Sequence, residues 1–396
     1  MALPISFDEQ RQRAARNYLY ILIVISLSKW ITVSALTLLA IRLKVLSVLD
    51  LTVRSFISKQ WLAVVCLVLV GYVMFCIVTI PFDYLKEYYF EHKFGLTLMG
   101  LRNWLSSKLE RKMLVLFALL ALTTFLYNAM LLDYFELLAI SAVTVLVIFF
   151  LLYQPPRFLE NRIYNIQSLG NGIILNIFTK LIEKTGVRGI NIYEIKTNPR
   201  TRKVIAETNG TGSQRRVMLS DTLLKSYSLD EVETVLGHEI AHHKFGHHWK
   251  FSIILISAFL SLFCSIYWIL HTTSTSSILG IDLQNLRQPT SVAYFPAYAL
   301  IFGFTYALCV PLMNTLSRWE EKQCDKFELE LVKKPEAFIS SIVKLCDQNL
   351  IYAYPNRLVE FLFYDHPSGK KRVTLGMKYI ASLYSPKEKM RSNIDA

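Results

Sequence analysis

The sequence predicts a mainly α-helical protein, in which a polytopic transmembrane bundle of about six spans carries a cytoplasmic domain with a small β-sheet. Three observations predict this class. Of the 396 residues, 53% are hydrophobic and the mean hydropathy is +0.36, more than a soluble chain of this length usually carries. The hydrophobic residues gather in runs long enough to cross a bilayer. The long polar stretch before the last two runs contains short strand-like patterns.

Each predicted span is a run with little or no charge. The runs are 18–41, 61–80, 113–132, 137–153, 251–270 and 292–313. The first is too long and too polar for a removable signal peptide, so we expect it to remain as an anchor. It contains Lys29, which either faces a polar interior or extends to the membrane surface.

Six spans place the polar stretch 154–250, the loop 81–112 and the tail after 313 on one side of the membrane. Lysine and arginine are dense in the polar stretch, whereas the opposite loop 271–291 contains only Arg287. This bias predicts a multi-pass protein with its polar domain in the cytoplasm, although the basic loop 42–60 argues mildly against that orientation. The predicted segments are 1–153, with four spans, 154–250, a polar domain, 251–313, with two spans, and 314–396, a polar C-terminal part.

The net charge of +13 does not indicate a nucleic-acid partner. The charge is spread through loops that flank the spans, and there is no nucleic-acid motif or aromatic platform. Attraction to the anionic headgroups of a lipid bilayer explains it better. The cysteines show neither a disulfide framework nor zinc spacing.

Three short strands are predicted in the polar domain. They are Asn191–Ile195, Lys203–Glu207 and Arg215–Leu219, and the turn Asn209–Gly212 joins the last two. An exposed strand in such a sheet can hold an extended peptide by backbone hydrogen bonds. The pattern equally allows a hairpin that only supports the helix after it.

That helix contains an HExxH motif. His238 and His242 are four residues apart, so both project from one face of a helix toward a single zinc ion, and Glu239 lies beside a water bound to that ion. Ser228 and Glu231 form a capping-box pattern that starts the helix about two turns earlier. Two imidazoles, a metal that acidifies water and a carboxylate that accepts its proton are the requirements of a zinc peptidase.

Neighbouring histidines allow a second interpretation. His243, His247 and His248 crowd the same region and resemble an adventitious metal-binding surface. His243 and His247 lack a glutamate in the position that Glu239 occupies, and they lie on a face rotated by about 100° from the first pair. This difference favours the site at His238 and His242.

A catalytic zinc needs a third protein ligand and leaves its fourth position to water. Directly after the last span, Glu321 and Asp325 share one face of a predicted helix. Glu321 can coordinate zinc while Asp325 orients a histidine through its second ring nitrogen. On spacing alone, a charged helix after a span is more often a solvated face.

Together, HExxH and the later S-R-x-x-E-x-x-(small)-D pattern resemble the membrane zinc metallopeptidase family that contains the type I CAAX prenyl proteases and the HtpX quality-control proteases. The resemblance implies a gluzincin-like peptidase domain, formed by 154–250 and completed by 314–396, with one zinc ion per chain. By the same resemblance, His238, His242 and Glu321 are the zinc ligands, Glu239 is the catalytic base, and Asp325 supports a ligand from behind.

The resemblance extends to other segments. Glu91–Gly95 and Arg216–Leu224 are similar to segments of the CAAX proteases, and Asp365–Ser368 with Arg372 resembles their H-P-x-x-x-x-R element. This implies that His366 and Arg372 polarise the substrate carbonyl or grip the substrate. The substrate strand of the family usually has Asn-Ala, and here Ile205, Ala206 and Glu207 occupy its place without the asparagine.

The resemblance implies a metalloendopeptidase whose partners are the lipid bilayer and a peptide or protein substrate, possibly prenylated. Four spans before the motif favour CAAX processing, which removes a C-terminal tripeptide after a prenylated cysteine. HtpX-like quality control of misfolded membrane proteins is the alternative. A receptor or channel with the same fold is the alternative of another class, and the intact Glu239 argues against it. CAAX proteases of eukaryotes have about seven spans around a chamber, against six predicted here.

Overall fold

The computed structural model describes residues 6–129, 165–170, 172–197, 201–210, 212–247, 277–278, 281–282 and 295–384. The predicted spans 137–153 and 251–270 lie outside these residues, as do Arg287 and His248. The described helices and strands, in chain order, are α1 (Glu9–Arg42), α2 (Val45–Phe56), α3 (Gln60–Tyr84), a π-helical turn (Leu85–Tyr89), α4 (Phe90–Lys93), α5 (Leu101–Ala129), β1 (Asn165–Ser168), α8 (Ile173–Thr185), β2 (Ile190–Lys196), β3 (Ala206–Asn209), a 3-10 turn (Gly212–Gln214), β4 (Arg215–Ser220), α9 (Asp221–Ser226), α10 (Leu229–Phe245), β5 (Ser277–Ile278), β6 (Ile281–Asp282), α13 (Phe295–Val332), α14 (Pro335–Asn349), α15 (Arg357–Phe363) and α16 (Gly369–Tyr384).

Within the described residues, two helical stretches are long and apolar enough to cross a membrane, Glu9–Arg42 and Trp61–Lys93. The predicted helical fold with a small sheet is confirmed, whereas only two of the six predicted spans are supported in this way. Helices α5 and α13 are continuous over the described parts of the predicted spans 113–132 and 292–313. The Nζ of Lys29 lies 2.6 Å from the Oδ1 of Asp83, so its charge is paired between α1 and α3.

The four-stranded sheet has the order β1-β2-β4-β3. Strand β4 pairs in parallel with β2 and antiparallel with β3, which leaves β3 at one edge. The three predicted strands are present, but the strand predicted at Lys203–Glu207 begins only at Ala206, and β1 was not predicted. The predicted turn follows β3, where Gly210 has a φ of +82° and a side chain would collide with the Gln214 carbonyl.

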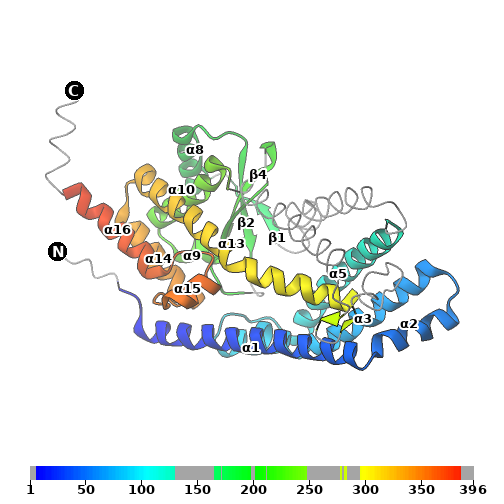
Figure 1. Cartoon of the computed structure of the whole chain (residues 1–396). Coiled ribbons are helices and arrows are strands. Elements are labelled where there is room, and N and C mark those ends of the chain that lie inside the picture. The colour runs from blue at the N-terminus through cyan, green and yellow to red at the C-terminus, as the bar shows by residue number, and fades with distance from the viewer. Residues whose placement is uncertain are drawn as a thin grey trace.

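Helix α10 occupies the centre of the sheet-containing part of the molecule (Figure 1). It packs against α8, β3, α13 and α14. Its residues Val232, Leu236 and Ile240 are buried in one core with Val217 and Leu219 of β4. Because apolar residues at this spacing fix one face of α10 against the sheet, the remaining faces are directed toward α13 and α14.

The first helix also contacts the last third of the chain. Both Arg11 and Gln12 bond to Asp347, at the C-terminal end of α14. The side-chain oxygen of Gln12 also accepts a hydrogen bond from the N–H of Ala353, 2.8 Å away. Helix α1 therefore extends from α14, near its N-terminal end, to α2 and α3 at its other end (Figure 1).

Candidate metal centre

Helix α10, which carries the HExxH motif, has well-defined ends. The Ser228 hydroxyl accepts a hydrogen bond from the N–H of Glu231, and the Glu231 carboxylate accepts one from the N–H of Ser228, so the predicted capping box is present. At the other end, Gly246 has a φ of +65° and its N–H donates to the carbonyl of His242. These caps hold the motif in regular helical geometry.

Helices α10 and α13 approach closely at Gly237. A Cβ at this position would lie 2.9 Å from the Val332 Cγ2 and 3.8 Å from the Glu328 Cα. Only glycine permits this separation without displacement of a neighbour. The close approach brings His238, the next residue of α10, against Glu321 of α13.

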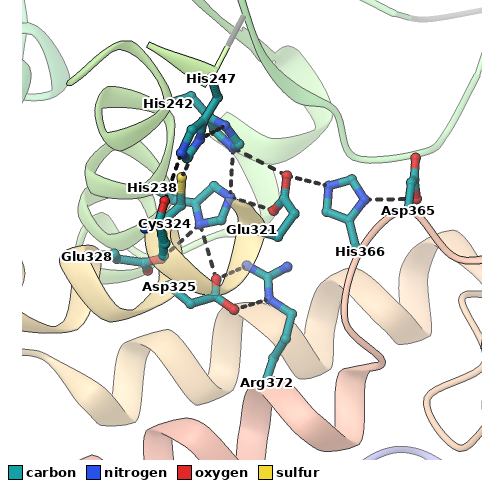
Figure 2. A network of polar contacts seen from close by, with 11 residues as sticks. His238, His242, His247, Glu321, Cys324, Asp325, Glu328, Asp365, His366 and Arg372 are labelled. Atoms are coloured by element: carbon teal, nitrogen blue, oxygen red, sulfur yellow. Dashed lines mark hydrogen bonds and ion pairs between the residues drawn. The ribbon is translucent and has the colours of Figure 1, made fainter. Parts of the chain in front are cut away.

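Four atoms of three side chains converge between these helices. The Nε2 atoms of His238 and His242 are 3.3 Å apart, and the two oxygens of Glu321 lie 3.0 Å and 3.3 Å from them. Figure 2 shows Glu321 directed at both rings. Nitrogen and oxygen ligands at 2.0–2.1 Å around a tetrahedral zinc ion are about 3.3 Å from one another. The donor set and its separations therefore fit a zinc ion.

Other side chains are near enough to His238 to join a metal site. These form the groups His238, His242 and Cys324, and His238, Asp325 and Glu328. Burial raises the pKa of the Cys324 thiol, and a metal ligand must be a thiolate. Both Asp325 oxygens are bonded to Arg372. Glu321 is the better third ligand because its two oxygens already face the two Nε2 atoms.

The second ring nitrogens of both histidines have partners behind the centre. The Nδ1 of His238 lies 3.2 Å from Asp325 and 3.4 Å from Glu328, as ion-pair contacts rather than aligned hydrogen bonds. The Nδ1 of His242 lies 3.2 Å from the Nδ1 of His247. Such partners fix the orientation of ligand rings. Sequence reasoning gave no role to Glu328, although it shares the face of Asp325, and it gave His247 little weight.

The two residues of the H-P-x-x-x-x-R element lie in different places. The Nε2 of His366 is 3.3 Å from a Glu321 oxygen, and the His366 side chain is 52% exposed. The guanidinium of Arg372 is buried and donates two hydrogen bonds to Asp325, of 2.9 Å and 2.5 Å. The geometry therefore allows His366 to meet a substrate, whereas Arg372 is engaged with Asp325 (Figure 2).

Charges in the centre shift its pKa values. Burial alone would lower the pKa of His238, but Asp325, Glu321 and Glu328 hold it above its usual value. Burial would raise the pKa of Glu321, but the surrounding histidines hold it low, so this side chain is an anion. Burial raises the pKa of Glu239 even though His238 and His242 oppose the shift. A carboxylate with raised proton affinity is suited to accept a proton near neutral pH.

His243 has a structural explanation. Its Nε2 lies 3.1 Å from the carbonyl oxygen of Arg216, and burial lowers its pKa to about 4. The ring is therefore neutral at physiological pH and links α10 to β4. This position agrees with the expectation that His243 lies on a different face from the HExxH pair.

A cavity of about 550 Å³ opens beside the centre. His238, Glu239 and His366 form part of its wall, and so do Ile205 and Ala206 of the predicted substrate strand. Glu207 lies in β3 but is not part of the wall. Many other lining residues are apolar or aromatic, among them Leu19, Leu22, Leu223, Ile342, Leu345, Tyr352 and Phe363. One proposed ligand, His238, thus faces the same space as Glu239, His366 and the start of the edge strand β3.

Comparisons with known proteins point to one family. The sequence model of Peptidase family M48 matches residues 169–375. The "Uncharacterized metalloprotease YhfN" of Bacillus subtilis is 22% identical over 57% of this chain, which spans 52% of that protein. CAAX prenyl protease 1 of Saccharomyces cerevisiae is 26% identical over 75% of this chain and 68% of its own length. The crystal structure of S. mikatae Ste24p shares the fold, with a TM-score of 0.76 and 19% identity over 94% of this chain and 91% of that chain.

Proposed function

Because a model of the family matches more than half of the chain, the protein belongs to Peptidase family M48, and on this premise we propose that it is a membrane-embedded zinc metalloendopeptidase of the CAAX prenyl protease type. The observation that carries the proposal is the convergence of His238, His242 and Glu321, with atom separations of 3.0–3.3 Å, beside the buried Glu239. The chain spans only about half of the length of the Bacillus relative, so activity, substrate and partners are all part of the proposal.

In the proposed mechanism, His238, His242 and Glu321 hold one zinc ion, which when bound acidifies water and polarises a carbonyl oxygen. Glu239 accepts the proton of the attacking water and delivers it to the leaving amine. His366, exposed to the cavity, donates a hydrogen bond to the carbonyl oxygen of the scissile bond.

Asp325 and Arg372 act from behind the ligands. Asp325 holds the His238 ring by its Nδ1, and Arg372 holds Asp325. This arrangement keeps the His238 Nε2 aimed at Glu321 and the metal position. We therefore assign Arg372 a positioning role in place of the substrate contact that its sequence element implies.

The proposed substrate is the C-terminal part of a prenylated CAAX protein, and the released product is a tripeptide. Support comes from the similarity to the yeast protein named CAAX prenyl protease 1, and from the apolar wall of the cavity, which suits an extended hydrocarbon chain. Helices α1 and α3 would anchor the protein in the lipid bilayer, with further spans beyond them. In this arrangement the metal centre faces the cytoplasm.

The test uses purified protein loaded with zinc, a farnesylated CAAX peptide and its unprenylated twin, with products identified by mass spectrometry. A Glu239→Gln variant is the matched control because it keeps all three proposed ligands. Release of the tripeptide by wild type alone, chiefly from the farnesylated peptide, supports the proposal. Equal cleavage of both peptides at scattered bonds would replace it with quality control. No cleavage of either, with zinc bound, would refute peptidase activity on this class and favour a non-proteolytic role.

A further inference from the structure

The chain segment that leads into β3 directs some of its backbone groups toward the sheet and others away from it. Ile205 bonds toward the sheet: its N–H donates to the Ser220 hydroxyl, and its carbonyl accepts from the N–H of Ser220. The carbonyl of Lys203 accepts from the Thr222 hydroxyl on the same side. Because backbone groups of successive extended residues point in opposite directions, the even-numbered residues face outward.

Two outward positions in this segment are already occupied. The Val204 N–H donates to the Oδ1 of Asn349 at 2.7 Å, and its carbonyl accepts from the Nδ2 of Asn349 at 2.8 Å. The Arg202 N–H donates to the carbonyl of Leu96 at 2.8 Å. The Asn349 carboxamide thus makes the pair of bonds that an added strand would make with Val204. The next outward residue is Ala206, which lines the cavity.

We infer that Asn349 is an end stop for a peptide bound along β3, and that it limits how many residues the substrate carries on the C-terminal side of the cleaved bond. This inference rests on the proposed function, because it needs a peptide that pairs with the edge strand. Asn349 would then determine specificity because its carboxamide occupies the backbone groups of Val204.

The direction of the bound peptide decides which end is limited. Antiparallel pairing is the more stable arrangement per residue, and it places the C-terminal end of the peptide toward Val204. Lys203 lies at the same end of the cavity wall. Its ammonium bonds to Glu91 at 2.7 Å and has two further N–H donors, which suit the free carboxylate of a peptide terminus.

The register then follows by counting. When one substrate residue pairs with Ala206, the next residue toward its C terminus lies opposite Ile205, and the one after that lies opposite Val204. That last place is filled by Asn349. A peptide can therefore extend by one residue beyond the residue paired with Ala206 before it meets the Asn349 carboxamide. The further residues of a longer peptide cannot pair with the edge of the sheet.

The test is a ladder of farnesylated peptides with one to eight residues after the cleaved bond, assayed by kcat/KM with wild type and with Asn349→Ala and Asn349→Asp. For wild type, kcat/KM should fall as the number of residues after the cleaved bond increases, and this fall is the length penalty. Asn349→Ala should reduce that length penalty on the order of tenfold, because two backbone bonds become available to the substrate. Asn349→Asp, which keeps only an acceptor for the Val204 N–H, should fall between. In each variant, activity on the shortest efficient substrate should change much less.

A matched control removes a similar bond elsewhere. The Nδ2 of Asn314 donates to the Leu362 carbonyl at 2.9 Å, outside the lining of the cavity, so Asn314→Ala should leave the length penalty as in wild type. Identical length dependence in wild type and Asn349→Ala, at equal zinc content and melting temperature, would overturn the inference.

The same ladder also separates this inference from the proposed function. Binding is measured by fluorescence polarisation to Glu239→Gln with and without Asn349→Ala. If wild type cleaves nothing but Glu239→Gln binds short tails better than long ones, and Asn349→Ala removes the difference, the end stop stands and the peptidase proposal falls. Binding that ignores tail length, or no binding of any peptide in the ladder, would refute the end stop.

Discussion

Replacement of Arg372 by alanine should weaken the metal centre, because the guanidinium bonds to Asp325 behind His238. Asp325, 1% exposed, would lose two hydrogen bonds from the guanidinium and keep only its contact with the His238 ring. Removal of one partner of a buried pair costs about 3–5 kcal/mol of folding stability. Because Asp325 would no longer hold the His238 ring, zinc affinity should fall by about 10–100-fold.

The assay is competition for zinc against a chromophoric chelator, with the melting temperature and kcat/KM at saturating zinc measured on the same preparations. Arg372→Lys keeps the charge but loses the two-pronged geometry, so its zinc affinity should lie between those of wild type and Arg372→Ala. The substrate role implied by sequence resemblance predicts the opposite pattern. Zinc affinity within about twofold of wild type, together with a collapse of kcat/KM at saturating zinc, would refute the positioning role.

Three further predictions concern α10. Glu239→Gln should abolish turnover and leave zinc content by elemental analysis at the wild-type ratio; turnover at the wild-type rate would exclude Glu239 as the base. Glu231→Gln should lower the free energy of unfolding by about 1–3 kcal/mol at neutral pH. Burial would raise the pKa of Glu231, but hydrogen bonds, chiefly from Lys344, hold it below 4.5. The carboxylate therefore stabilises the fold above that pH, and this stabilisation is lost as the pH falls further. Melting curves from pH 7 to 3 should therefore converge for the two proteins, and a constant gap would contradict this. Gly237→Ala should cost about 1–3 kcal/mol through the contact with Val332, more than the gain of up to about 1 kcal/mol in helix propensity; a raised melting temperature would contradict the tight packing.

Local patterns of the sequence predicted the elements that depend on local chemistry. The capping box at Ser228 and the strand–turn–strand region around Gly210 could be predicted because their signals lie within a few residues of one another. The convergence of His238, His242 and Glu321 was predicted from spacing within two helices and from family resemblance. Spacing alone could not show that the two helices meet.

Contacts between distant segments could not be predicted. The bonds from Asn349 to Val204 join residues 145 positions apart, and neither residue belongs to a motif. The pairing of Arg372 with Asp325 is separated by 47 positions, so resemblance directed attention to a substrate while the fold supplied a different partner. Lys29 was ambiguous for the same reason, because Asp83 is 54 positions away. Short β1 has no alternation long enough to be recognised.

The contacts between α1 and the end of α14 have a consequence for biosynthesis. Gln12 bonds to Asp347 and Ala353, residues that are made 335 and 341 positions later. At about 5–20 residues per second, a ribosome needs roughly 20–70 s to traverse that interval. During this time Gln12 lacks these native partners, and the first turn of α1 is open to chaperones and proteases. The first turn of α1 therefore reaches its native contacts only after α14 has been made, and nascent chains stalled before residue 347 leave Arg11 and Gln12 without them.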